Sequence, residues 1–136
     1  VSIQAQVINL MQDIKKEYQL TYLFISHDLR IIKHFCDRVM VMYLGNIVEL
    51  GTKEAIYGNQ RHPYTKALLS AVSNVKGHGS KNRIILQGDI PSPVNPPSGC
   101  PFHTRCSYCM DICREKKPEL KKMADGTLVA CHLDME

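Results

Sequence analysis

Hydrophobic residues recur every three or four positions in the first twenty residues of the chain. Polar residues fall largely between them, so the pattern predicts an amphipathic helix with one core face. The residues on that face are Ile3, Val7, Leu10, Met11, Ile14 and Tyr18. The run TYLFIS (21–26) that follows is short and nearly continuously apolar. It predicts a strand with both faces covered.

The next segments continue the alternation of helix and strand. HDLRIIKHFCD predicts a second helix, with Asp28 as its N-cap. Residues 38–44 and 47–51 predict a hairpin around the turn Gly45-Asn46. This order indicates an α/β fold in which the hairpin forms an antiparallel edge.

The second half of the chain changes character. A short helix is predicted near KEAIYG, a longer one from about Pro63 to Val75, and a strand at 83–87. Residues 76–81 (KGHGSK) resemble a polar linker, and residues 88–99 hold four of the seven prolines, which excludes a helix or a central strand. We therefore expect two parts, 1–75 and 76–136, the second with its cysteines on a loop without secondary structure.

Composition narrows the class of protein without identifying it. The chain has 136 residues, 44% hydrophobic and 22% charged, with a net charge of +4, which is typical of a globular protein. One dense basic cluster, at residues 116–122, is interpreted as a solvated face, so no nucleic-acid partner is expected. No stretch is apolar for long enough to cross a bilayer, and no signal peptide is recognised. The start at Val1, in mid-pattern, suggests that residues upstream have been removed.

His27 is the first candidate for chemistry. It stands in FISHDL, directly after the predicted strand 21–26 and before the N-terminus of the next helix. Ligands of open α/β sheets bind at the carboxyl ends of the strands, and a histidine there can donate to a phosphate oxygen. The alternative is a loop histidine that only hydrogen-bonds to backbone.

The cysteines are the second candidate. Five of the six follow residue 99, and four of them show the spacing C-x5-C-x2-C-x3-C in residues 100–113. This spacing partly matches ferredoxin-like cluster loops and lacks the paired C-x2-C knuckles of common zinc sites. An iron–sulfur cluster, zinc with help from His103 or His132, and inert thiols all remain open at this point.

Three longer stretches then point to a family. The segment 22–57, RHPYTKALLSAV (61–72) and GDIPSPVNPPSGCPFHTRC (88–106) resemble the C-terminal part of the ATPase subunits of oligopeptide and dipeptide ABC importers, with nickel-importer subunits related. The resemblance implies an α/β fold, the C-terminal part of a P-loop NTPase nucleotide-binding domain. Residues 1–75 would belong to that domain, and 76–136 would be a small Cys-rich extension.

The resemblance also implies functional residues and partners. His27 would be the switch histidine that contacts the γ-phosphate of ATP. Cys100, Cys106, Cys113 and Cys131 would bind a [4Fe–4S] cluster, with Cys109 as an alternative fourth ligand and Zn²⁺ as the alternative metal. The intact protein would use ATP and Mg²⁺. It would pair with a second homologous ATPase subunit and bind transmembrane permease subunits, peripherally on the cytoplasmic face of the cell membrane.

The sequence also lacks parts that such an ATPase needs. No G-x-x-x-x-G-K-[ST] phosphate loop occurs in these residues. We therefore expect the chain to be a C-terminal fragment that does not hydrolyse ATP alone and exposes apolar surface. The competing hypothesis is an independent iron–sulfur or zinc module, which would need a more complete core.

Overall fold

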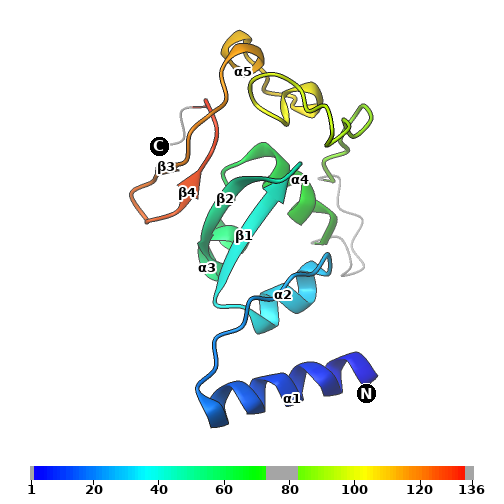
Figure 1. Cartoon of the computed structure of the whole chain (residues 1–136), viewed down its shortest axis with the longest axis vertical. Coiled ribbons are helices and arrows are strands. Elements are labelled where there is room, and N and C mark those ends of the chain that lie inside the picture. The colour runs from blue at the N-terminus through cyan, green and yellow to red at the C-terminus, as the bar shows by residue number, and fades with distance from the viewer. Residues whose placement is uncertain (1, 73–82, 134–136) are drawn as a thin grey trace. The chain divides into compact units, whose positions relative to one another are not determined.

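The computed structural model describes residues 2–72 and 83–133 of the chain. They belong to two compact units, an N-terminal unit (Val1–Asp37) and a C-terminal unit (Arg38–Glu136) (Figure 1). The domain boundary predicted between residues 75 and 76 lies outside the described residues. Each unit is described by itself below.

The N-terminal unit opens with helix α1 (Ile3–Tyr18), as predicted. Its start is fixed by Ser2, whose Oγ accepts a hydrogen bond from the Ala5 amide at 3.2 Å. Its predicted core face stays largely uncovered, because no residue of α1 is buried and Ile3 is 80% exposed.

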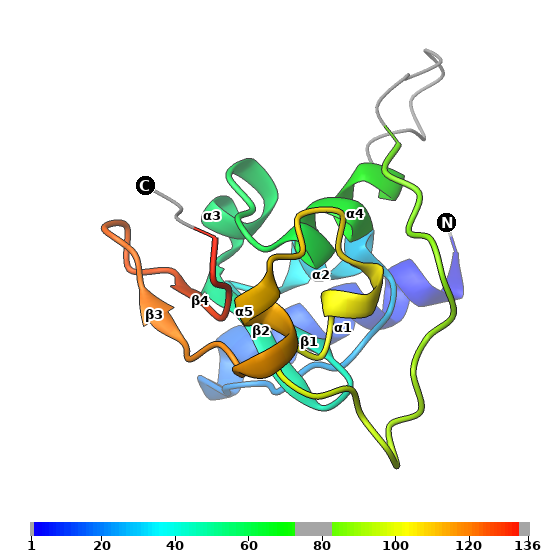
Figure 2. The same ribbon diagram turned by 90° about the horizontal axis from the view of Figure 1, so that it is seen from above.

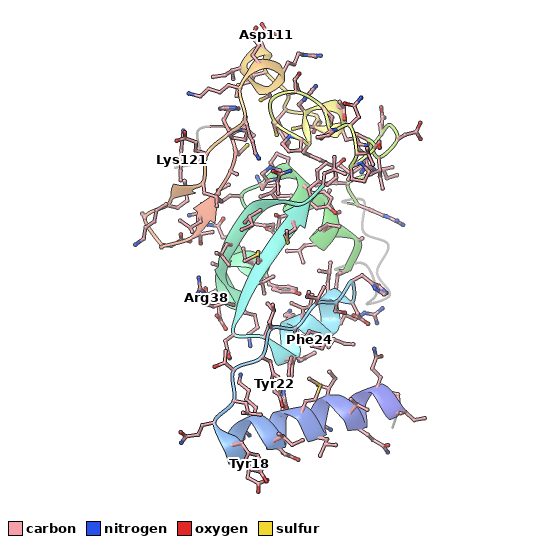
Figure 3. The ribbon with its side chains drawn as sticks, viewed as in Figure 1. Tyr18, Tyr22, Phe24, Arg38, Asp111 and Lys121 are labelled. Carbon is pink, nitrogen blue, oxygen red and sulfur yellow. The ribbon has the colours of Figure 1, made fainter. Side chains whose placement is uncertain are left out.

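The strand predicted at 21–26 is not formed. These residues are extended, but they have no ladder partner among the residues described. Tyr22 and Phe24 (Figure 3) lie against Phe35. The ring centroid of Phe35 is 5.7 Å from that of Tyr22 and 5.0 Å from that of Phe24. Leu23 and Ile25 point the other way and are 91% and 89% exposed. The alternation is that of a strand, but a strand needs a neighbouring backbone to bond.

Helix α2 (Leu29–Phe35) completes the N-terminal unit, with Asp28 as its N-cap as predicted. The extended segment and α2 are joined by the short Ser26–Asp28 connection. Phe35 is the only residue of α2 that is buried. Among the described residues of this unit only Phe35 is buried, and the half-buried rings of Tyr22 and Phe24 lie against it.

The C-terminal unit is built on the predicted hairpin, strands β1 (Arg38–Tyr43) and β2 (Asn46–Thr52). Its turn lies one residue earlier than predicted, at Leu44 and Gly45, which have φ values of 45° and 74°. Two successive positive φ values suit the twist of a two-residue hairpin turn. Strand β4 (Leu128–Val129) pairs antiparallel with β2, and β3 (Lys121–Lys122) pairs with β4. Figure 2 shows this small sheet from above.

Helices α3 (Lys53–Gly58) and α4 (Pro63–Val72) follow the hairpin, close to the predicted positions. The predicted extension of the second helix to residue 75 lies outside the described residues. The core of the unit joins residues far apart in sequence, since Val48, Ile56, Phe102 and Val129 are at most 3% exposed. Helices with a small antiparallel sheet are consistent with the predicted α/β class.

Two predictions about the second half are wrong. No strand forms at 83–87, and the cysteine segment does have secondary structure. Residues 100–115 contain the 3₁₀ turn η2 (His103–Arg105) and helix α5 (Asp111–Glu115). Strands β3 and β4 follow, before Cys131. The proline-rich residues 88–99 form neither helix nor strand, as predicted. Within the described ranges, no helix has the length and apolarity needed to cross a membrane.

Candidate functional site

His27 lies on the surface of the N-terminal unit, between the extended segment and α2. The backbone on its C-terminal side is held by Asp28, whose Oδ1 accepts hydrogen bonds from the amides of Arg30 (2.9 Å) and Ile31 (3.4 Å). On the other side, the Asp28 amide donates to Ser26 Oγ at 3.0 Å. The imidazole of His27 has no hydrogen-bond partner among the described residues. It is therefore presented to solvent on a fixed turn and does not serve as a cap.

The second candidate site lies in the C-terminal unit, where Gly99 brings two ends of the cysteine loop together. The Cys100 amide donates to the Cys113 carbonyl at 2.8 Å. A Cβ on Gly99 would stand 2.4 Å from that carbonyl oxygen, and φ is +71°. Only glycine fits such a position. The sequence interpretation missed this residue, although a glycine directly before a cysteine at the end of a proline-rich run was the available signal.

Four thiols of the C-terminal unit interact with one another. We call Cys100, Cys106, Cys113 and Cys131 the four-thiol cluster. Every pair of its thiols interacts electrostatically. These are the four cysteines that the family resemblance indicated. Cys131 is the second residue after β4. Cys109 interacts with Cys106, and its Sγ donates to the Met110 carbonyl at 3.6 Å.

Burial controls the protonation of the cluster. It raises the pKa of Cys100 to about 11, against a smaller opposite effect of the hydrogen bond from the Phe102 amide. Burial likewise raises the pKa values of Cys106 and Cys131, whose sulfurs accept from the amides of Tyr108 and of Leu133 and His132. Burial thus favours the protonated form of these three thiols, and a cation that binds them must displace their protons.

The cluster is not a finished ligand set in this conformation. Across residues 2–72 and 83–133, no three His, Cys, Asp or Glu side chains form a group that could hold a metal ion. The two histidines considered as zinc ligands are each bonded to backbone through one ring nitrogen. His103 Nδ1 lies 2.8 Å from the Cys100 carbonyl, and His132 Nε2 lies 2.7 Å from the Lys116 carbonyl. The donor chemistry of four thiols suits a thiolate metal site, but the described side chains are not arranged as one.

Glu49 is a buried residue that sequence interpretation also missed. It lies on β2 with no exposed surface. Its Oε1 and Oε2 accept from the amides of Arg61 (2.8 Å) and His62 (3.0 Å), just before α4. It also interacts electrostatically with Cys131. A charged residue within a predicted strand was the signal, and the two amide donors to its carboxylate explain why it is tolerated there.

Part of the chain matches a known protein family. Residues 48–113 match the family described as "Oligopeptide/dipeptide transporter, C-terminal region". This match begins in β2 and ends at Cys113, so it covers three cysteines of the four-thiol cluster and leaves Cys131 outside. Over these residues the chain is similar to the C-terminal region of that transporter family.

Individual relatives extend the match to almost the whole chain. It is 56% identical over 135 residues to the oligopeptide transport ATP-binding protein AppF of Bacillus subtilis. It is 52% identical to the dipeptide transport ATP-binding protein DppF of Haemophilus influenzae and 50% identical to the putative peptide import ATP-binding protein BOV_A0347 of Brucella ovis. Each alignment covers 98% of this chain and 41–42% of the relative. The chain thus spans about two fifths of the length of these relatives, and its resemblance to peptide-transporter ATPases is confirmed.

Proposed function

We propose that this chain is the C-terminal portion of an ATP-hydrolysing subunit of an ABC importer for oligopeptides or dipeptides. One observation supports it above all: identity of 50–56% over 98% of the chain to ATP-binding proteins of peptide transport. Residues 1–75 would contribute to the nucleotide-binding domain of a P-loop NTPase, and 76–136 would form its C-terminal extension.

His27 would act on the γ-phosphate of ATP. Its imidazole is exposed, and the capping of α2 by Asp28 fixes the backbone around it. A donor fixed before the reaction stabilises the charge that develops on the transferred phosphoryl group without reorganising. Mg²⁺, bound with the nucleotide, would neutralise part of the phosphate charge. The phosphate loop that holds the β- and γ-phosphates would lie in a part of the protein other than these residues.

A histidine exchange in the full-length protein tests this role. His27→Ala is expected to lower ATP turnover by about 10²–10³-fold, as for other preorganised donors, while ATP affinity changes little. His34→Ala is the matched control, because His34 is also an exposed histidine of the N-terminal unit. Equal turnover in the two variants would contradict this role. A fall in melting temperature specific to His27→Ala would assign His27 a structural role instead.

The uncovered apolar residues of the N-terminal unit support the view that this unit is part of a larger domain. Ile3, Leu23 and Ile25 are between 80% and 91% exposed. Isolated in water they would favour association. The remaining strands of the nucleotide-binding domain would cover them. Permease subunits and a second homologous ATPase subunit are the proposed partners, at the cytoplasmic face of the membrane.

The four-thiol cluster supports a second proposal, a structural metal site in the C-terminal extension. Four cysteine sulfurs suit a [4Fe–4S] cluster, with Zn²⁺ as the alternative. The metal would tie Cys131, after β4, to the loop that holds Cys100, Cys106 and Cys113, and so would stabilise the extension. The family resemblance indicates Cys131 as the fourth ligand, so we place Cys109, the alternative, outside the ligand set. No observation favours an independent metal-binding module with another role.

Two glycine exchanges test the metal site. The full chain is purified without oxygen and analysed for iron, zinc and visible absorption. Gly99→Ala is expected to lose most of the metal, because its Cβ would displace the Cys113 carbonyl. Gly58→Ala is the control, since nothing lies within 4 Å of its added Cβ. A colourless protein with stoichiometric zinc would show that the site binds zinc and not an iron–sulfur cluster. Full metal content in Cys131→Ser would contradict the proposed ligand set.

A further inference from the structure

Cys109 is a thiol that the proposed metal site leaves unused. It follows Cys106 by three residues, in the sequence Cys-Ser-Tyr-Cys. The Cys109 amide donates to the Cys106 carbonyl at 3.3 Å, so residues 106–109 form a hydrogen-bonded turn. In a β-turn the first and last Cα atoms lie within about 7 Å, which overlaps the Cα separation of about 4.4–6.8 Å that a disulfide requires.

The thiols of Cys106 and Cys109 are also close enough to interact, and both are accessible to solvent. They interact electrostatically. Neither is buried, whereas Cys100 and Cys113 are only 8% and 7% exposed. The hydrogen bond from Cys109 Sγ to the Met110 carbonyl is itself exposed and weak at 3.6 Å, so rotation of this side chain toward Cys106 loses little.

We propose that Cys106 and Cys109 are a thiol–disulfide switch. A low-molecular-weight disulfide is the oxidant. The Cys109 thiolate attacks one of its sulfurs, and the first small thiolate leaves. The Cys106 thiolate then attacks Cys109 Sγ in this mixed disulfide, the protein disulfide forms, and the second small thiolate leaves. Two protein thiols are oxidised and one small disulfide is reduced to two thiols, so atoms and electrons balance.

The switch has a consequence for the four-thiol cluster, and this consequence rests on the metal site proposed above. Cys106 is a member of the cluster, so the disulfide removes one sulfur ligand from it. Cys100, Cys113 and Cys131 would remain as thiols. The oxidised chain should bind metal poorly until a dithiol reduces the disulfide. The metal content of the four-thiol cluster would therefore depend on the thiol–disulfide balance of its compartment.

Peptide mapping tests the switch directly. The metal-free full chain is equilibrated with oxidised glutathione, blocked with an alkylating agent and cleaved after Arg105, Tyr108 and Arg114 and before Asp111. These cuts separate Cys106, Cys109 and Cys113, so residues 106–108 and 109–110 stay together only if the disulfide joins them. The linked peptides should lie about 2 Da below the sum of the reduced pair and separate on reduction.

Three variants make the result decisive. Cys109→Ser is expected to abolish the linked peptide, and Cys36→Ser, in the N-terminal unit, to leave it unchanged. Cys131→Ser should also leave the linked peptide unchanged. This variant excludes the competing disulfide between Cys106 and Cys131 and keeps the Cys106–Cys109 pair. A Cys106–Cys131 peptide in the parent chain, or glutathione bound to Cys109 without the internal disulfide, would overturn the proposal.

Metal uptake separates this proposal from the metal site. After oxidation and removal of the oxidant, iron or zinc uptake by the parent chain should fall at least about tenfold, and a dithiol should restore it. Cys109→Ser, treated identically, should retain its uptake. If no form of the chain binds metal while the linked peptide is still found, the metal site fails and the disulfide stands. Equal uptake by the oxidised parent and Cys109→Ser would contradict the switch as a control of metal binding.

Discussion

The N-terminal and C-terminal units bury their hydrophobic residues to very different extents. The N-terminal unit leaves Leu23 and Ile25 about nine-tenths exposed. The C-terminal unit buries Ile56, Phe102 and Val129 to 2% or less. A hydrophobic pattern therefore determined a local conformation in both units, but burial followed only where residues distant in sequence could supply the other side. The difference predicts that truncating a buried side chain of the C-terminal unit destabilises the chain more than truncating an exposed one of the N-terminal unit.

A pair of truncations should show the largest contrast between the units. Phe102 packs against Tyr43, Tyr64 and His62, with ring centroids 5.2, 5.3 and 5.7 Å away. Phe102→Ala should lower the free energy of unfolding by about 3–5 kcal/mol, the usual effect of truncating a buried aromatic ring. Leu23→Ala should change it by less than about 0.5 kcal/mol, because its side chain is exposed. Denaturant titration followed by tyrosine fluorescence measures both.

The same pair can also break the comparison. If Leu23→Ala proves as harmful as Phe102→Ala, Leu23 is covered in solution, and self-association of the isolated chain is the expected reason. Sedimentation of the parent chain and of the variant would then show a shift from an assembly toward a monomer.

A pH titration should give the next largest effect. Burial lowers the pKa of His62 from its ordinary 6.5 to about 4, and its Nδ1 accepts a hydrogen bond from the Tyr64 amide at 3.1 Å. The folded pKa lies below the unfolded one, so the unfolded chain binds the proton more readily. Stability should therefore fall as the pH drops from about 6.5 to about 4, by on the order of 3 kcal/mol.

His62→Gln identifies the source of this pH dependence. The variant should lose most of the decline between these pH values, whatever its stability at neutral pH. A parent chain whose unfolding free energy is constant across this range would show that His62 is solvated, and that this part of the core is open to water.

Removal of the Glu49 carboxylate should have a somewhat smaller effect. Glu49→Ala leaves the buried amides of Arg61 and His62 without their acceptors. The expected loss is about 1–3 kcal/mol per unsatisfied group at most, reduced where water enters the space. Glu54→Ala, an exposed position on α3, is the control and should stay within about 0.5 kcal/mol. Equal melting curves for the two variants would show that the hydrogen bonds from Arg61 and His62 to Glu49 add little to stability.

The elements that could be predicted are those defined by local pattern. Helix α1, the Asp28 cap and the β1–β2 hairpin each depend on residues within one or two turns of chain. The strand predicted at 21–26 did not form. Among the described residues, no backbone lies beside it as a ladder partner. Strand β4, helix α5 and the Gly99 contact could not be foreseen, since each depends on residues that meet only in the folded unit.

The candidate sites divide in the same way. The place of His27 before a capped helix was visible in FISHDL. The grouping of Cys131 with the cysteines of residues 100–113 came from family resemblance, because nothing in the local spacing distinguishes it from Cys109. Its position after β4, which pairs with β2, supplies the physical reason. The roles of these residues remain predictions for the experiments above.

The smallest expected effect concerns the ion pair between Arg61 and Asp125. Arg61 Nη1 and Asp125 Oδ2 are 2.8 Å apart, and the acid lies on the surface. The hydrogen bond from Arg61, followed by that from the Thr127 amide, lowers the pKa of Asp125 to about 2. This stabilisation is present above the ordinary pKa of an aspartate and is lost as the pH falls toward 2. Because solvent and salt screen an exposed pair, Asp125→Asn should shift the melting temperature only slightly, and the shift should shrink in high salt. A large shift that salt does not change would show that Asp125 acts instead through the turn that joins β3 to β4, where its Oδ1 accepts from the Thr127 amide at 3.0 Å.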